Sequence, residues 1–214
     1  MPRYRSIPTI ADIDRQLRRR RLVKRGSAWG ILLLVVSIVL DHFGVFGHKG
    51  NDWRNLDQQQ VVVTKVVDGD TVHVKATVSG AEEKVRLIGI DAPELHFNHK
   101  SPPDYWAEQA TKYLTDRSLG KTITLKIEPT QTRDRYGRLL GYLYVTDTDN
   151  LNADMVRDGQ AYADRRFKHT FRPQFEQAEA EARKKQRGLW KNVQKNQMPP
   201  WRQKWLDTTK RNSP

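Results

Sequence analysis

The sequence has no cysteine among its 214 residues. Disulfide bonds and thiolate metal sites are therefore excluded, and the redox compartment stays undetermined. Histidines are also few: there are six, and His96 and His99 share one short polar loop. A lone pair of histidines without cysteine does not predict a transition-metal cluster. Repeats of domain length are absent, and the part before residue 60 has no capacity for a separate core, so one folded domain is expected.

Long apolar runs are scarce. Residues 28–40 are uncharged and mostly aliphatic, but at about 1.5 Å per residue they are too short for a hydrocarbon core of roughly 30 Å. Extension through Phe46 reaches spanning length, with Asp41 near the far interface. Three interpretations compete: a signal anchor over 27–46, a cleaved signal peptide, and a buried or interfacial helix. The lack of a small-x-small cleavage pattern after Leu40 favours the retained anchor.

Acidic residues are outnumbered, with 25 Asp and Glu against 38 Lys and Arg and a net charge of +13. About half of this excess lies in residues 1–26, which hold nine Lys or Arg and two Asp. A basic segment directly before an apolar run predicts a single-pass membrane protein with a cytoplasmic amino terminus. Beyond a polar linker over 47–60, the domain is then expected on the extracytoplasmic side, at the periplasmic or external face of a bacterial cell. Only the remaining basicity can attract a polyanion.

Segments rich in β-branched and aromatic residues, separated by Asp-Gly, Ser-Gly or Tyr-Gly turns, predict five strands. They cover residues 61–67, 71–78, 84–90, 121–127 and 138–145. Three helices are predicted: one between Pro102 and Gly120, one over 152–158 and one over 173–187. Strands with an interposed helix, followed by further helices, predict an α+β fold, a five-stranded OB-type barrel over 61–190.

Two arginines and two aspartates lie at the ends of predicted strands, beside turns. A phosphodiester gains negative charge when water attacks it, and arginine can donate two hydrogen bonds to a phosphate without losing its proton. Arg86 and Arg138 are the candidates for this role. Asp70 and Asp91 offer the carboxylate oxygens that calcium or magnesium prefers. This combination predicts chemistry on a phosphate.

The residues after Asp91 extend this set. The backbone carbonyl of Ala92 is a candidate third metal ligand. Pro93 forces the chain out of the strand, so Glu94 could face the same cavity without ligating the ion. From there it could orient or deprotonate the attacking water. The whole set predicts cleavage of a phosphodiester.

Each motif also has a purely structural interpretation. Asp68-Gly69-Asp70 is a common turn, because Asp caps its own backbone and Gly accepts a positive φ. An arginine in an alternating strand is usually solvated, and residues 91–94 could simply end a strand. Residues 135–138 could be a basic hairpin turn. The occurrence of all three motifs in one chain, each at a strand end, favours the functional interpretation.

Three of these motifs together resemble the thermonuclease family, the staphylococcal-nuclease-like domains. They are residues 67–71, residues 86–94 and residues 134–142, and a weaker fourth lies at 151–161. The resemblance covers the whole predicted domain. It implies an OB-fold barrel that cleaves DNA and RNA with calcium and leaves 3′-phosphate ends.

Carried over residue by residue, the resemblance assigns roles to each motif. The calcium ligands are Asp70, Asp91 and the backbone carbonyl of Ala92, with Asp68 as support behind them. The transition-state and leaving-group arginines are Arg86 and Arg138, and the general base is Glu94. Substrate contacts are expected from Asp134, Arg135, Tyr136 and Arg165. The chain departs from the family at 164–167, where some members stack a base on tyrosines, so electrostatic contact with the substrate is expected there instead.

Two classes of function remain. The favoured one is a membrane-tethered, metal-dependent nuclease, expected to be a monomer that acts on nucleic acid with little sequence preference. The alternative is a non-catalytic OB-fold module for nucleic-acid binding or scaffolding, because this fold is widely used for binding alone. The complete set of arginines and carboxylates favours the enzyme. The basic tail over 191–214, with Trp201 and Trp205, could pack on the domain, lie on lipid headgroups or stay disordered.

Overall fold

The computed structural model describes residues 52–96 and 101–211, and the predicted anchor over 27–46 lies outside them. Within this described part, none of the helices has the length and apolar character needed to cross a membrane. Five strands close into a barrel in the order β1-β2-β3-β6-β5. The barrel strands are β1 (Gln59–Asp68), β2 (Thr71–Ala76), β3 (Glu82–Leu87), β5 (Thr122–Ile127) and β6 (Leu139–Tyr144). The predicted five-stranded barrel is confirmed.

The barrel is built from alternating strands that bury one face. In β3, for example, Val85 and Leu87 are fully buried while Arg86 between them points the other way, as the two-residue period of a strand requires. β3 and β6 pair in parallel, and all other neighbours in the barrel pair antiparallel. A parallel pair needs a long crossover, and α3 (Ala107–Ser118) with β5 supplies it.

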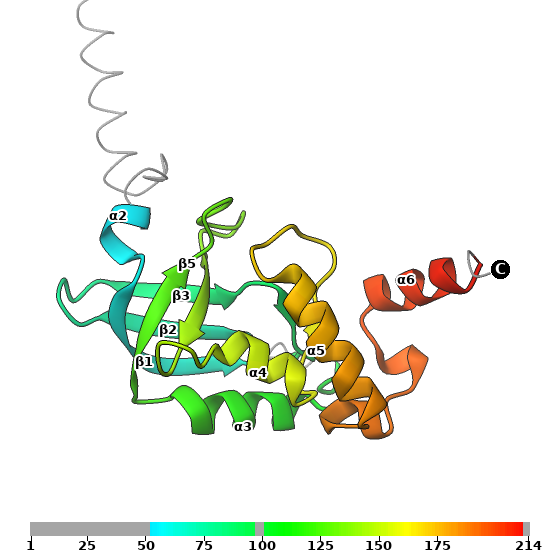
Figure 1. Ribbon diagram of the computed structural model, residues 1–214. Helices are drawn as coiled ribbons and strands as arrows, with labels where there is room; N and C mark the ends of the chain where they lie inside the picture. The colour runs from blue at the N-terminus through cyan, green and yellow to red at the C-terminus, as the bar shows by residue number, and fades with distance from the viewer. Residues whose placement is uncertain (1–51, 97–100, 212–214) are drawn as a thin grey trace, which may run out of the picture. The chain divides into compact units, whose positions relative to one another are not determined.

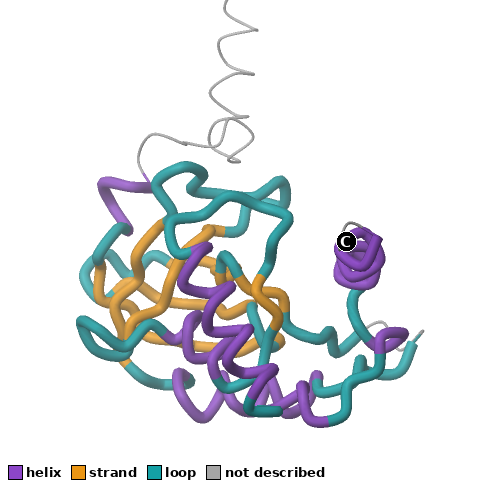
Figure 2. The backbone as a smooth tube through the Cα atoms, turned by 45° about the vertical axis from the view of Figure 1, so that its right-hand side comes forward, coloured by secondary structure: helices purple, strands orange, loops and turns teal. Residues whose placement is uncertain are grey.

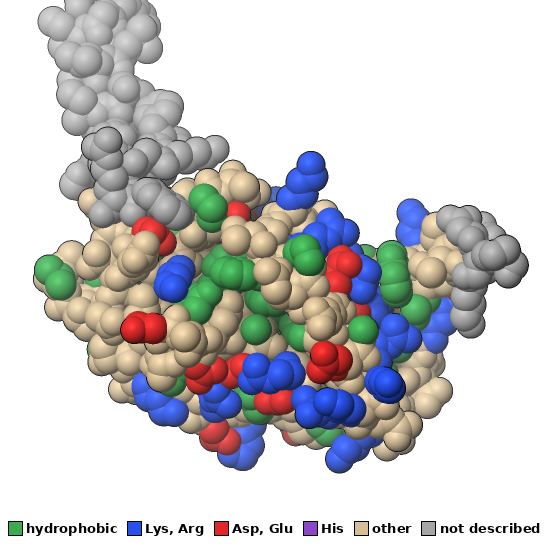
Figure 3. All heavy atoms as spheres, viewed as in Figure 1, with side chains coloured by type: hydrophobic (Ala, Val, Ile, Leu, Met, Phe, Trp, Pro, Cys, Tyr) green, Lys and Arg blue, Asp and Glu red, His purple; other side chains and the backbone are tan. Residues whose placement is uncertain are grey.

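Helices cover one side of the barrel, as Figures 1 and 2 show. α3 packs on β1, while α4 (Leu151–Arg157) packs on β6 and on α5 (Arg172–Lys184). The Asn150 side chain caps α4 by accepting hydrogen bonds from the backbone N–H groups of Asn152 and Ala153, which satisfies two of the donors that a helix start leaves free. Side chains of both signs are interspersed over the face in Figure 3.

The prediction of three helices is too low, because five α-helices occur in residues 52–96 and 101–211. α2 (Asp52–Leu56) lies in the segment predicted as linker, and α6 (Pro200–Arg211) lies in the tail. Ion pairs explain the first: Arg133 binds both Asp52 and Glu83, at 2.7 and 2.8 Å, and so ties α2 to the barrel. Burial of Arg202 explains the second, because this side chain of α6 is 0% exposed. Two short 3₁₀ turns, η1 (Gly188–Lys191) and η2 (Lys195–Gln197), connect α5 to α6.

The strand predicted over 84–90 is also interrupted. Gly89 has a φ of +82°, a conformation that glycine adopts without strain. A Cβ at this position would lie 2.4 Å from the ring of His169. The chain turns there and continues as β4 (Ile90–Asp91), which pairs with β7 (Tyr162–Ala163) in a separate two-stranded sheet. This break directs Asp91 away from the barrel wall.

Candidate active site

The turn between β1 and β2 carries Asp70, which forms an ion pair with Arg86 of the site. Asp70 is 2% exposed, and its carboxylate accepts hydrogen bonds from the Thr71 hydroxyl at 3.0 Å and the Ala92 backbone N–H at 2.9 Å. The Asp68 carboxylate accepts the backbone N–H of Asp70 at 3.1 Å. Gly69 is required because a Cβ would lie 2.6 Å from that of Ala92. The turn therefore holds Asp70 against the segment that carries Asp91.

Arg86 lies between the two predicted metal ligands. Its guanidinium forms an ion pair with Asp70 and a second one, at 3.2 Å, with Asp91. Burial lowers the pKa of Arg86, but the charges of Asp70 and Asp91 outweigh burial and raise it above the usual value for arginine. The three residues come from the β1–β2 turn, β3 and β4, and the fold brings them together.

Arg138 reaches the site from the loop before β6. Asp134 organises this loop: its carboxylate accepts the backbone N–H groups of Tyr136 and Arg138, at 2.9 and 3.0 Å, and the Arg138 Nε–H at 2.7 Å. Asp134 thus orients Arg138. The neighbouring Arg135 donates to the Tyr136 hydroxyl at 2.6 Å and lies over its ring. Tyr136 itself is 68% exposed.

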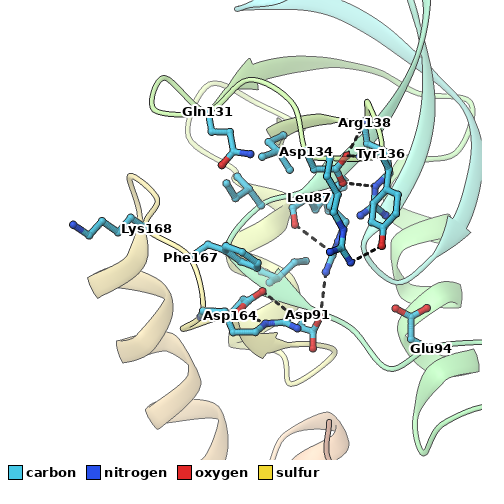
Figure 4. A pocket seen from close by; sticks show the side chains of 17 residues that line it. Leu87, Asp91, Glu94, Gln131, Asp134, Tyr136, Arg138, Asp164, Phe167 and Lys168 are labelled. Carbon is cyan, nitrogen blue, oxygen red and sulfur yellow. Dashed lines mark hydrogen bonds and ion pairs between the residues drawn. The ribbon is translucent and has the colours of Figure 1, made fainter. Parts of the chain in front are cut away.

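A pocket of about 590 Å³ unites these elements (Figure 4). Seven residues of the predicted site line it: Arg86, Asp91, Glu94, Asp134, Arg135, Tyr136 and Arg138. Asp70, which pairs with Arg86, lies behind this wall. Phe167 and Lys168 complete the opposite wall, with the Phe167 side chain 58% exposed. An exposed ring beside paired arginines is suited to contact with the faces of nucleobases.

Glu94 lies at the edge of this pocket, and its carboxylate stands apart from the hydrogen-bonded side chains in Figure 4. No hydrogen bond or ion pair joins this carboxylate to the other pocket residues drawn in Figure 4. Partial burial and the charge of Asp68 raise the pKa of Glu94 against the opposing charge of Arg86. A carboxylate with a raised pKa and a free oxygen is a stronger base than an ordinary glutamate.

The structure separates Arg165 from the pocket and puts Arg166 in its place. Arg165 pairs with Glu176 and Glu179 of α5 at 3.3 and 3.4 Å, so it does not line the pocket. Arg166 lines it instead, with its guanidinium 2.7 Å from Asp91. The sequence prediction named Arg165, whereas the residue of this Arg-Arg pair that lines the pocket is Arg166.

Asp91 has one further partner, which the sequence did not predict. The indole N–H of Trp201 donates to Asp91 Oδ2 at 2.7 Å. Trp201 lies in α6, 110 residues away along the chain. No local pattern connects the two positions, and only the packing of α6 brings them together.

Comparisons with known proteins agree with this geometry. The family model described as staphylococcal nuclease homologue matches residues 84–192, about half of the chain. An uncharacterized endonuclease of Escherichia coli O157:H7 is 36% identical over 139 residues, which are 65% of this chain and 80% of that protein. This chain belongs to the staphylococcal nuclease family. The resemblance found in the sequence is thereby confirmed.

Other members of the staphylococcal nuclease family match in different proportions. The thermonuclease of Staphylococcus intermedius is 30% identical over 170 residues, covering 75% of this chain and 95% of that protein. Endonuclease YhcR of Bacillus subtilis is 36% identical over 168 residues, but the match spans only 14% of its length. The family model itself matches the chain from within β3 to the residue after η1.

The staphylococcal nuclease family implies a metal ion, and the donors here fit one. Burial raises the pKa of Asp70 well above its usual range against the charge of Arg86, and Asp68 and Asp91 raise it further. A divalent cation would counter this excess of negative charge. Among the residues described, no cluster of three or more His, Cys, Asp or Glu side chains could hold a metal. Two carboxylates, a backbone carbonyl and waters still make an oxygen set suited to a hard cation such as calcium.

Proposed function

We propose that this protein is a calcium-dependent nuclease that hydrolyses phosphodiester bonds of DNA, RNA or both and leaves 3′-phosphate ends. One observation carries the proposal: Arg86, Glu94 and Arg138 line a single pocket, and both Asp70 and Asp91 form ion pairs with Arg86. Membership of a family whose named relatives are endonucleases and thermonucleases supports it.

In the proposed reaction, Glu94 orients a water molecule and takes its proton as the oxygen attacks phosphorus. Negative charge then builds on the phosphate oxygens, and Arg86 and Arg138 stabilise it through hydrogen bonds that are strongest at this point. The bond from phosphorus to the 5′ oxygen breaks, Arg138 stabilises the departing oxygen, and that oxygen takes a proton from solvent while Glu94 returns its own proton to solvent. The products are a 3′-phosphate and a 5′-hydroxyl.

The cation would be held by Asp70, Asp91 and the carbonyl of Ala92. When bound, it supplies positive charge to the phosphate and lowers the cost of the transition state. In the present arrangement Arg86 forms an ion pair with each of the two carboxylates.

For substrate binding, we propose that Arg135, Tyr136 and Phe167 contact the nucleotides beside the cleaved bond. They line the same pocket, and both rings are exposed. Contacts of this kind read charge and ring faces rather than base edges, which favours broad specificity. Electrostatic contact is proposed for Arg166 rather than for Arg165.

The test is cleavage of 3′- and 5′-labelled single- and double-stranded oligonucleotides by the purified full-length chain. Activity is expected with calcium and none with a chelator in excess. Treatment of the products with a phosphatase that removes 3′-phosphates should shift their migration. Binding of oligonucleotides without any cleavage would support a non-catalytic OB-fold module instead.

We further propose that residues 27–46 anchor the protein in a membrane, with the amino terminus in the cytoplasm and residues 51–214 on the extracytoplasmic side. The support is the cluster of arginines before residue 28 and the apolar run after it. Such a location would keep a nuclease of broad specificity away from the cell's own chromosome. A reporter fused after Pro214 should be active only in its exported form, and recovery of the domain from the cytosol would contradict the proposal.

A further inference from the structure

α6 lies outside the part of the chain that the family model matches, which ends at residue 192. It nevertheless reaches the site through Trp201, whose indole N–H is 2.7 Å from Asp91 Oδ2. We propose that α6 is a positioning element for the cation site, in which Trp201 holds the Asp91 carboxylate in the orientation that ligates the ion. This inference rests on the proposed metal-dependent function.

The hydrogen bonds of Asp91 show which oxygen is left for a cation. Oδ1 accepts from Arg86 at 3.2 Å and from Arg166 at 2.7 Å, which uses both of its acceptor positions. Oδ2 accepts only from Trp201 among the described residues, so one acceptor position of Oδ2 stays open. The indole fixes the carboxylate without filling that position. A partner of this kind is the usual device by which proteins orient a metal ligand.

Trp201 also contacts Arg166, the ion-pair partner of Asp91. Its ring lies 5.0 Å from the guanidinium of Arg166, which in turn binds both Asp91 and Asp164. A cation held against an aromatic face is stabilised by the ring quadrupole. The same side chain therefore supports two partners of one carboxylate.

A buried anchor keeps α6 in this position. Arg202 is 0% exposed and pairs with Glu179 of α5 at 2.7 Å. Its guanidinium is surrounded by the rings of Trp190, Trp201 and Trp205, at 5.6, 5.9 and 4.6 Å. Its Nε and Nη1 atoms are buried without a hydrogen-bond partner, so the rings and Glu179 alone compensate for the lost water.

The anchor is connected to the strand that carries Asp91. Glu179 accepts the backbone N–H of Ala163 at 3.1 Å, and Ala163 in β7 pairs with Ile90 in β4, next to Asp91. α6 thus supports Asp91 in two ways. Trp201 binds the Asp91 side chain directly. Arg202 acts on the backbone of β4 indirectly, through Glu179 of α5 and then through β7. Such double support is what a metal ligand on a two-residue strand requires.

The experiment measures calcium binding directly, by titration calorimetry on the full-length protein. Trp201→Phe keeps the ring but removes the donor, and it should weaken calcium binding by about tenfold or more. Trp205→Phe is the matched control, because it keeps an aromatic ring beside Arg202 and Trp205 has no hydrogen bond to Asp91, so it should change binding by less than about twofold. In an Asp91→Ala background, Trp201→Phe should add no further loss, since its effect passes through that carboxylate.

The possible results separate this inference from the proposed function. If Asp91→Ala binds calcium as wild type does, the proposed metal site is wrong and this inference fails with it. If Asp91→Ala loses binding while Trp201→Phe binds as tightly as wild type or more tightly, only the positioning role is refuted. A second readout uses wild-type protein: in NMR spectra the indole N–H signal of Trp201 should shift on addition of calcium while that of Trp205 stays in place. An unchanged Trp201 signal would also overturn the inference.

Discussion

Removal of the Glu179 carboxylate should be among the most costly single changes in this domain. Glu179 is 1% exposed and accepts three donors: Arg202 at 2.7 Å, the Ala163 N–H at 3.1 Å and Arg165 at 3.4 Å. Glu179→Ala leaves the guanidinium of Arg202 buried without a counter-charge. Loss of one partner from a buried ion pair costs about 3–5 kcal/mol.

Arg202→Met should cost clearly less than Glu179→Ala. The methionine is apolar and fits among the three tryptophan rings, while Glu179 keeps Arg165 and the Ala163 N–H as donors. Loss of one partner from a buried ion pair is costly because it leaves a charge uncompensated, and in Arg202→Met the Glu179 carboxylate keeps its pair with Arg165. The asymmetry between the two variants is the specific consequence of this arrangement.

Thermal unfolding followed by circular dichroism measures both variants. For a domain of this size, each kcal/mol corresponds to about 2–4 °C in Tm, so Glu179→Ala should lower Tm by roughly 6–20 °C. Glu181→Ala is the control on the same helix, because its pair with Lys185 is about half exposed at 3.9 Å and contributes at most about 1 kcal/mol. A Glu179→Ala variant as stable as the Glu181→Ala variant would refute the reasoning.

Three further predictions follow from the same structure. Burial lowers the pKa of His169 in the folded protein, so the unfolded chain binds a proton at a higher pH than the folded protein does. The free energy of unfolding should therefore decrease as the pH falls below about 6.5. This decrease should be smaller in His169→Gln. Gly69→Ala should lower the free energy of unfolding in urea by about 1–3 kcal/mol, since a Cβ would lie 2.6 Å from Ala92 and 2.9 Å from Ala110; unchanged stability would contradict this close packing. Asp70→Asn should raise the calcium concentration for half-maximal cleavage, and cleavage that persists in excess chelator would exclude the metal requirement.

The barrel and most of the site could be predicted from the sequence because their signals are local. Alternation in 84–87 indicates which face of the strand is buried, and it leaves Arg86 on the other face. The motif 91–94 carries a strand end, a proline and two carboxylates within four residues. Motifs of this length also carry the resemblance to the family, which the comparisons confirm.

The parts that could not be predicted depend on contacts between distant segments. Which of Arg165 and Arg166 lines the pocket depends on the path of the chain after β7. The hydrogen bond between Trp201 and Asp91 forms only because α6 packs beside the site. That docking depends on the pair of Arg202 with Glu179, 23 residues away in the chain. The composition of a basic, tryptophan-containing tail is compatible with packing on the domain, with binding to lipid headgroups and with disorder, so the sequence alone does not distinguish these three alternatives.

The central claim is that one pocket holds the catalytic groups, and the single-turnover rate of calcium-activated cleavage tests it most directly. Arg138→Ala and Glu94→Gln should each lower this rate by about a hundredfold or more, because each removes an interaction that is strongest in the transition state. Arg135→Ala, a change in the same loop as Arg138, should weaken substrate binding and leave the rate within a few-fold of wild type. Folded Arg138→Ala and Glu94→Gln variants that cleave at the wild-type rate would contradict the account.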